Sequence, residues 1–270
     1  MAKRPVLRAS TLLKQAIEAA RKLELAASQK HLPKRLQVAG LGFLVRNRRI
    51  ARAIERLGRE SSYESRILLR VMLEIKINYA WIRLRNTHSR ALRFHQFWSI
   101  ERLKLLENTA TIFKPPDYSE RKRLLQIERA KVRNLFRFRD SSGKMQWAKS
   151  WASVSSVEAR LVEVQKKEKP NDAPDPFLYG MYVSFSTATR GSPNSLNEVL
   201  TIDGAHVKAS LQPESRPDNH RMGAFILLAW TIEAFAEDAK LRRRCRADLK
   251  KVRAAIKELK RRSKHLQTTA

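Results

Sequence analysis

Two ladders of polar side chains are the best candidates for chemistry in this sequence. Each ladder has three members spaced four residues apart, namely Arg70, Glu74 and Asn78 in the first and Tyr182, Ser186 and Arg190 in the second. This spacing places each set on one face of a predicted helix. A carboxylate beside guanidinium, hydroxyl and amide groups could form a binding or catalytic cleft. The same groups could instead form a buried hydrogen-bonded network that fixes helix register, which the sequence favours.

A second pattern places a histidine five positions after an arginine. Arg83 precedes His88 and Arg90 precedes His95 in this way, which matches the R-x4-H spacing of HEPN-type helical ribonucleases. In such a site the imidazole acts as acid or base on a 2′-hydroxyl while the arginine holds the phosphate. Because the chain is rich in arginine, this spacing arises readily by chance. A turn position for His88 and a packing role for His95 are favoured.

Signatures of metal and cofactor binding are missing from the sequence. The remaining histidines are scattered, with no H-x3-H or HExxH spacing. Neither a phosphate-binding glycine loop nor a hydrolase nucleophile elbow occurs. The single cysteine, Cys245, excludes an intrachain disulfide and favours a reducing, cytoplasmic compartment. We therefore expect no cofactor and no metal.

Positive charge is the strongest functional signal. Lys and Arg number 56 against 26 Asp and Glu, which gives a net charge of +30 over 270 residues. Such an excess favours a polyanionic partner, and basic helix faces suit the phosphates of nucleic acid. Few aromatic residues accompany the basic ones, so base stacking is not expected and binding should be largely independent of sequence. The predicted contact residues are Arg46, Arg48, Arg49, Arg52 and Arg56 in one segment and Arg242, Arg243, Arg244, Arg246, Lys250, Lys251 and Arg253 in another.

Helical periodicity and a scarcity of glycine predict an all-α protein, an irregular multi-helix bundle with a long basic C-terminal helix. The most apolar window, 222–236, is shorter than the roughly 20 residues that span a bilayer, so no transmembrane segment is expected. A long loop is expected over 195–219, with a short extended piece at 199–202. Helices are expected over 10–27, in a basic segment that begins near 40, and over 61–85, 89–112, 118–138, 153–167, 177–189 and from 219 past 259.

The last predicted helix carries an apolar stripe. Its members alternate four and three residues apart, namely Leu241, Cys245, Leu249, Val252, Ile256 and Leu259. A heptad-like stripe of this kind needs a partner helix. The partner could be the N-terminal helix of the same chain or a second copy, so a homodimer through the C-terminal helix is one expectation.

Three patches together resemble the bacterial domain of unknown function family 5677. The first patch joins residues 65–79 and 93–104, which are similar to two of its helices. The second, residues 143–150, is similar to its W-x-x-K-S turn, and the third, residues 182–193, to its Y-x-x-x-S-x-x-x-H-G-S segment. The resemblance covers about residues 45–240 and implies an all-helical domain with no established activity. It also places the two polar ladders in one domain, where we expect them to share a pocket. Arg190 stands where the family pattern has histidine, which removes a group that titrates near neutral pH.

These observations predict three segments: an N-terminal basic arm and helix over 1–44, a helical domain over 45–240, and a basic heptad-like helix and tail over 241–270. The expected function is non-enzymatic nucleic-acid binding through phosphate contacts, with RNA slightly preferred to DNA. One alternative is a helical RNase or nucleotide-directed enzyme, of a phage-defence or toxin type, that uses the polar pocket. Another is a helical protein-interaction or dimerisation module.

Overall fold

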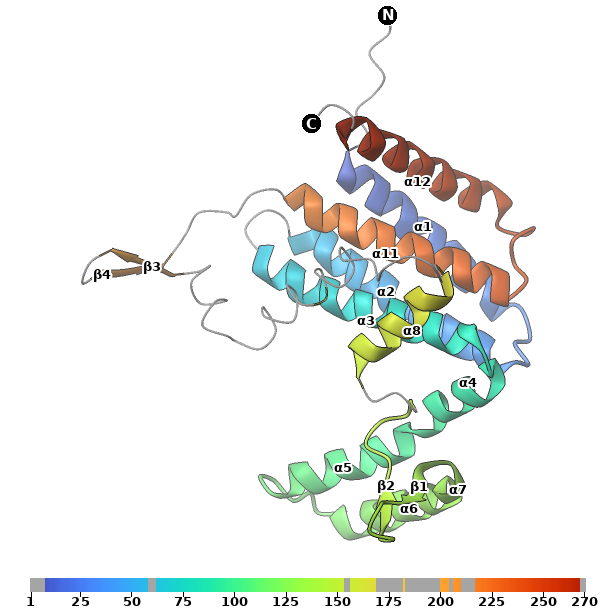
Figure 1. Ribbon diagram of the computed structural model, residues 1–270, viewed down its shortest axis with the longest axis vertical. Coiled ribbons are helices and arrows are strands. Elements are labelled where there is room, and N and C mark those ends of the chain that lie inside the picture. Colours follow the sequence, from blue (N-terminus) through green and yellow to red (C-terminus); the bar gives the residue numbers. More distant parts are fainter. Residues whose placement is uncertain are drawn as a thin grey trace, which may run out of the picture.

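Helices make up most of the described chain, which confirms the all-α prediction (Figure 1). The computed structural model describes residues 8–57, 62–152, 156–168, 182, 200–203, 206–209 and 217–267. Its helices are α1 (Ala9–Ser28), α2 (Arg35–Leu57), α3 (Ser62–Leu84), α4 (Thr87–Gln96), α5 (Trp98–Ala110), α6 (Tyr118–Lys131), α7 (Arg133–Phe136), α8 (Val157–Glu168), α11 (Pro217–Asp238) and α12 (Arg246–Gln267). No helix among these residues is long and apolar enough to cross a membrane.

The main body is organised around α11, which packs against α1, α2 and α3. One cluster of buried apolar side chains runs through these helices and into α12. Leu13, Phe225 and Phe235 are at most 1% exposed within it. Because burying one large apolar side chain contributes about 1.5–3 kcal/mol, this cluster dominates the stability of the body.

A glycine allows α2, α3 and α11 to meet closely. A Cβ on Gly40 would overlap Tyr79 Oη and lie 3.0 Å from Phe235 Cδ2. The buried Tyr79 donates a hydrogen bond of 2.6 Å to Asp238 Oδ2 at the end of α11. Because Gly40 has no side chain, α2 can approach Tyr79 of α3 and Phe235 of α11 this closely.

The prediction of one unbroken C-terminal helix is wrong. Helix α11 ends at Asp238, and the chain turns through Lys240, whose φ of 54° is left-handed, before α12 begins at Arg246. Helix α12 folds back onto α1 and α11. The stripe residues Leu249 and Val252 are 2% exposed there and belong to the main core. The partner of the stripe is thus a helix of the same chain.

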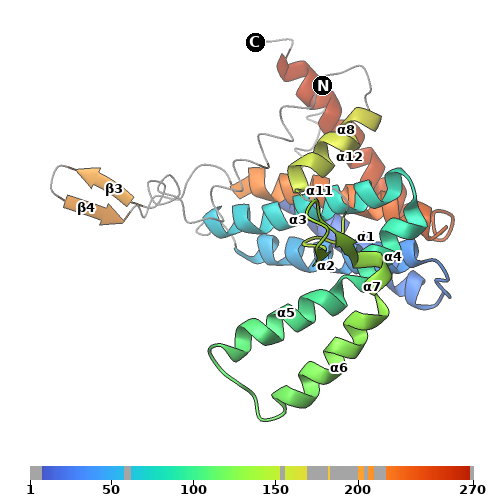
Figure 2. The same ribbon diagram turned by 60° about the horizontal axis from the view of Figure 1, so that its bottom comes forward.

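The helix predicted over 89–112 is also divided. Helix α4 ends at Gln96 and α5 starts at Trp98. Phe97 between them has a φ of −62° and a ψ of −24°, which are helical values, and is buried in a second, smaller apolar cluster with Ile100 and Phe136. Helices α5 and α6 form a hairpin that projects from the body (Figures 1 and 2).

Two short antiparallel hairpins interrupt the helices. Strands β1 (Arg137–Arg139) and β2 (Met145–Trp147) were not predicted; the Asp140 carboxylate accepts backbone N–H groups in their turn, where Gly143 has a φ of 79°. Strands β3 (Leu200–Asp203) and β4 (His206–Ala209) include the extended piece expected near 199–202. The helix predicted over 177–189 lies outside the described residues, except for Tyr182.

Candidate polar pocket and nucleic-acid interface

The structure brings together members of both polar ladders. Arg70 Nε donates to Glu74 Oε1 at 2.9 Å, and Arg70 Nη2 donates to Tyr182 Oη at 3.4 Å. The guanidinium carbon lies 5.1 Å from the centroid of the Tyr182 ring, within cation–π range. Ser186 and Arg190 lie outside the described residues.

Helix α8 adds charges that compensate those of the ladder. Tyr182 is buried, and burial raises the pKa of its phenol, which the Glu158 carboxylate raises further. Burial lowers the pKa of Arg160, and the nearby carboxylate of Glu74 opposes this shift by favouring the charged guanidinium. Two guanidinium groups and two carboxylates therefore surround one protonated phenol. A buried polar network that holds α3 against α8 is stable only when its charges balance one another in this way.

Glu74 and Asn78 also face a groove of about 300 Å³ between α2, α3 and α4. Its floor is aromatic, with the rings of Phe43 and Phe94 4.9 Å apart. The Oδ1 atom of Asn78 is buried and accepts no hydrogen bond from any residue that the structure describes. Because no solvent reaches this atom, a donor in the groove could contact it only if the surrounding side chains moved.

Two more polar side chains border this groove, Arg46 from α2 and His95 from α4. His95 Nε2 lies 3.2 Å from the carbonyl oxygen of Arg35. A carbonyl only accepts, so Nε2 is the donor in this contact. The sequence assigned Arg46 to the basic surface and missed its place at the groove, because that depends on how α2 packs against α3.

Both arginines of the R-x4-H patterns have structural partners. Arg90 is buried, 3.5 Å above the Trp81 ring, and donates to Glu163 Oε1 at 3.0 Å and to the Trp81 carbonyl. Arg83 Nε donates to Asp238 Oδ1 at 3.1 Å. Each guanidinium is therefore already held by a carboxylate rather than left to bind phosphate.

One face of α2 presents cations to solvent. Its members are three, three and four residues apart, exposed, and without an ion pair or hydrogen bond to any other described residue: Arg46, Arg49, Arg52 and Arg56. Arg48, also predicted to bind nucleic acid, points elsewhere and places its Nε 2.6 Å from Glu24 Oε1. The ion pair removes Arg48 from this surface.

The second basic surface is the turn before α12 and the outer face of that helix. Three of its predicted residues have partners: Arg242 lies 3.1 Å from Glu237, Arg253 makes two bonds to Glu233 of 2.8 and 2.6 Å, and Arg244 donates to the residue after α1. The remaining four are exposed and have no such partner in the described part of the chain: Arg243, Arg246, Lys250 and Lys251.

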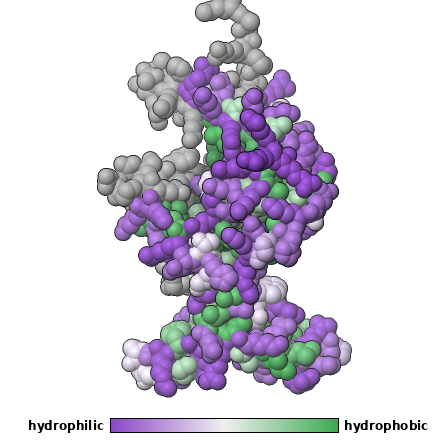
Figure 3. All heavy atoms as spheres, turned by 90° about the vertical axis from the view of Figure 1, so that its right-hand side faces the viewer, coloured by the Kyte–Doolittle hydropathy of each residue, from purple (hydrophilic) through white to green (hydrophobic). Residues whose placement is uncertain are grey.

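The two basic surfaces lie on different helices of the body. Helix α1 packs against both α2 and α12. Hydrophilic side chains cover most of one side of the body, as Figure 3 shows. A long polyanion could therefore contact either surface separately.

Fold and surface define a basic all-α protein, a helical bundle with a projecting hairpin. Residues 37–206 match a family of unknown function, DUF5677, and the chain belongs to that family. The match begins inside α2 and ends at β4, so both of its ends lie earlier in the chain than the 45–240 that were expected. Helices α1, α11 and α12 lie outside the matched residues, although they contribute to the main core. No curated protein and no solved structure matches the chain.

Proposed function

We propose that the protein binds nucleic acid through its phosphate backbone, using the exposed arginine face of α2 and the unpaired basic residues of α12. The supporting observation is that the α2 arginines have no carboxylate partner among the described residues, whereas Arg48 on the same helix does. Ten residues separate Arg46 from Arg56, or about 15 Å of helix, which is long enough to contact several phosphates. Phosphate contacts position a protein without selecting a base sequence.

RNA stays ahead of DNA as the expected partner, and the compartment we propose is the cytoplasm. The only cysteine, Cys245, is buried, and burial raises the pKa of its thiol. A buried thiol of raised pKa is unreactive, and the proposed compartment rests on the single cysteine, which can form no intrachain disulfide.

Fluorescence anisotropy with a labelled single-stranded RNA, and with DNA of the same sequence, tests this proposal. The triple variant R46Q/R49Q/R52Q should bind both probes more weakly than the wild type. The matched control K104Q/R123Q/K131Q removes the same charge from exposed positions of α5 and α6. Equal losses in the two variants would mean that only net charge matters, and would overturn the assignment to α2.

A second candidate function, binding or conversion of a nucleotide, is supported by the mixed aromatic and polar lining of the groove. The groove combines an aromatic floor with carboxylate, amide, imidazole and guanidinium groups. Glu74 could accept a hydrogen bond from the amino group of a base, while Arg46 holds a phosphate. His95 Nδ1 would be the base in an enzyme of this kind.

Calorimetric titration with nucleoside mono- and diphosphates tests this candidate. Arg46→Gln should abolish the heat of binding, whereas Arg56→Gln, on the same face of α2 but outside the groove lining, should leave it unchanged. Heat that both variants retain would rule the groove out as the site.

Homodimerisation through the C-terminal helix is the remaining alternative. The burial of its apolar stripe within the same chain argues against it. Leu249 and Val252 already pack within the chain. A dimer through α12 would have to use its outward face, where Lys250 and Lys251 would oppose the same charges on a second copy.

A further inference from the structure

Exposed apolar side chains gather on the hairpin of α5 and α6. Of the ten large hydrophobic residues exposed in the described part of the chain, seven fall between positions 98 and 138. They are Trp98, Leu105, Ile112, Phe113, Leu124, Ile127 and Phe138. Figure 3 shows hydrophobic residues on this lower part, below the hydrophilic body. A concentration of this kind marks an interaction site, whereas scattered exposed leucines do not.

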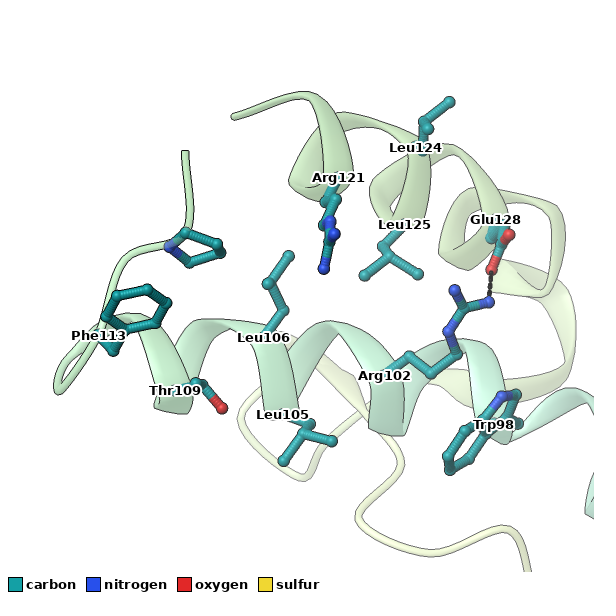
Figure 4. Close-up of a pocket in the computed structure, with 11 residues that line it drawn as sticks. Trp98, Arg102, Leu105, Leu106, Thr109, Phe113, Arg121, Leu124, Leu125 and Glu128 are labelled. Atoms are coloured by element: carbon teal, nitrogen blue, oxygen red, sulfur yellow. Dashed lines mark hydrogen bonds and ion pairs between the residues drawn. The ribbon is translucent and has the colours of Figure 1, made fainter. Parts of the chain in front are cut away.

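The hairpin contains an apolar groove of about 540 Å³. Leu106 of α5 and Leu125 of α6 lie between the two helices, as Figure 4 shows. Trp98 and Leu105 of α5 and Phe113 of the loop that follows it extend the groove, with exposed fractions of 57%, 62% and 64%. Helices α5 and α6 diverge toward the loop that joins them (Figure 2).

The hairpin is poorly packed on its own. Helix α6 has 14 residues and buries one of them, Leu125, while α5 buries Ile100 and Leu103. Helix α1, in the body, buries nine. Most helical stability in proteins comes from tertiary packing, and isolated helices of this length are marginal. An occupant of the groove would supply the packing that α5 and α6 lack.

We propose that the occupant is a second copy of this chain, docked hairpin against hairpin. The charges that line the groove favour this over an acidic peptide. Arg102 lies 3.3 Å from Glu128, and Arg121 lies 2.5 Å from Asp117, so each groove arginine is already neutralised within the hairpin. The groove therefore selects apolar surface rather than negative charge.

The apolar area is sufficient for such a dimer. From their exposed fractions, Trp98, Leu105, Phe113 and Leu124 present about 500 Å² in total. A standard interface has about 800 Å² per partner, of which about 60% is apolar, which again gives about 500 Å². The same surface carries both groove and protruding side chains, as a two-fold interface between identical surfaces needs.

The position of the hairpin also suits two copies. It projects away from the body (Figure 1), so two hairpins can pair while the strongly basic bodies remain apart. Repulsion between the bodies should still oppose association at low salt. Added salt screens that repulsion and leaves apolar burial intact, so the dimer should strengthen as salt rises. Nucleic-acid binding should weaken over the same range, which makes the two activities separable.

Sedimentation velocity of the full chain, freed of nucleic acid, tests the proposal from low micromolar to about 100 µM protein. The wild type should form dimers, more of them at about 0.5 M than at about 0.15 M salt. Leu105→Glu should weaken association at least about tenfold, because it places an unpaired charge in the interface. The matched control is Leu25→Glu on α1, where the leucine is 50% exposed and lies outside the groove.

Leu105 is exposed, so Leu105→Glu should keep the far-ultraviolet circular dichroism of the wild type; Trp98→Glu is a second variant with the same expected loss. A wild type that stays monomeric at high salt would overturn the proposal. So would dimers that survive both substitutions, or dimers that dissociate as salt rises. A monomer that sediments with phosphatidylserine vesicles in a Leu105-dependent way would assign the groove to a membrane surface instead.

Discussion

Glu163 holds α8 against α3 and α4, and its replacement tests whether Arg90 is structural. The Glu163 carboxylate accepts from Trp81 Nε1 at 2.5 Å, from Arg90 Nη2 at 3.0 Å and from Arg85 Nη2 at 2.9 Å. The Arg90 side chain is 9% exposed and that of Arg85 is 69% exposed. Glu163→Ala would leave a buried indole N–H without its acceptor and a buried guanidinium with only the Trp81 carbonyl to accept from it.

Breaking a buried ion pair costs about 3–5 kcal/mol. Because 24% of the Glu163 side chain is exposed, water can replace part of the carboxylate, and we expect the lower end, about 3 kcal/mol. Arg85→Ala removes an exposed partner of the same carboxylate and should change stability by less than about 1 kcal/mol. In a chain of this size about 3 kcal/mol corresponds to a fall of roughly 6–12 °C in Tm.

Urea unfolding followed by circular dichroism measures both variants. Glu163→Gln should be milder than Glu163→Ala, because the amide oxygen can still accept from Trp81. Burial raises the pKa of Glu163, but hydrogen bonds from Trp81 and Arg90 outweigh it and lower that pKa overall. The contribution of Glu163 is thus present above its unfolded pKa of about 4.5 and lost as pH falls through the lower, folded value. Equal stability of Glu163→Ala and Arg85→Ala would refute this account of Arg90.

Two further predictions concern packing and pH. Gly40→Ala should destabilise the protein by about 1–3 kcal/mol, because the added methyl group would overlap Tyr79. At Gly42 an added methyl group meets no atom within 4 Å, so Gly42→Ala should stabilise the protein by about 0.5–1 kcal/mol. Urea unfolding of the two variants measures both changes. Burial lowers the pKa of His220, so its contribution to stability is complete above the unfolded value of about 6.5 and is lost as pH falls through the lower, folded value. His220→Gln should flatten this part of the profile of Tm against pH, and an unchanged profile would contradict the assignment.

Helix positions were predictable because burial imposes a period on the sequence. The expected helices over 10–27 and 61–85 agree with α1 and α3 to within a residue or two. The breaks at Phe97 and Lys240 were not predictable, because neither is glycine or proline and the apolar pattern continues across both. Only packing shows them: Phe97 enters a second cluster, and the turn at Lys240 lets α12 reach α1.

The candidate sites divide in the same way. Spacing grouped Arg70 with Glu74, and the family resemblance placed Tyr182 in the same domain, so the three were predicted to be neighbours. Which cations remain unpaired could not be predicted, because the carboxylates that neutralise Arg48 and Arg253 come from other helices. Tertiary structure is needed to separate a charge that serves folding from one that is available to a ligand.

The dependence of RNA affinity on salt tests the central proposal most directly. If the α2 face binds phosphates, log affinity should fall linearly with log salt, with a contribution of about 0.7 to the slope from each contact on a single strand. Arg49→Gln should therefore reduce the slope by about 0.7, while Arg48→Gln, one residue away and paired with Glu24, should leave it unchanged. An affinity that barely changes with salt, or equal effects of the two substitutions, would contradict nucleic-acid binding by this face.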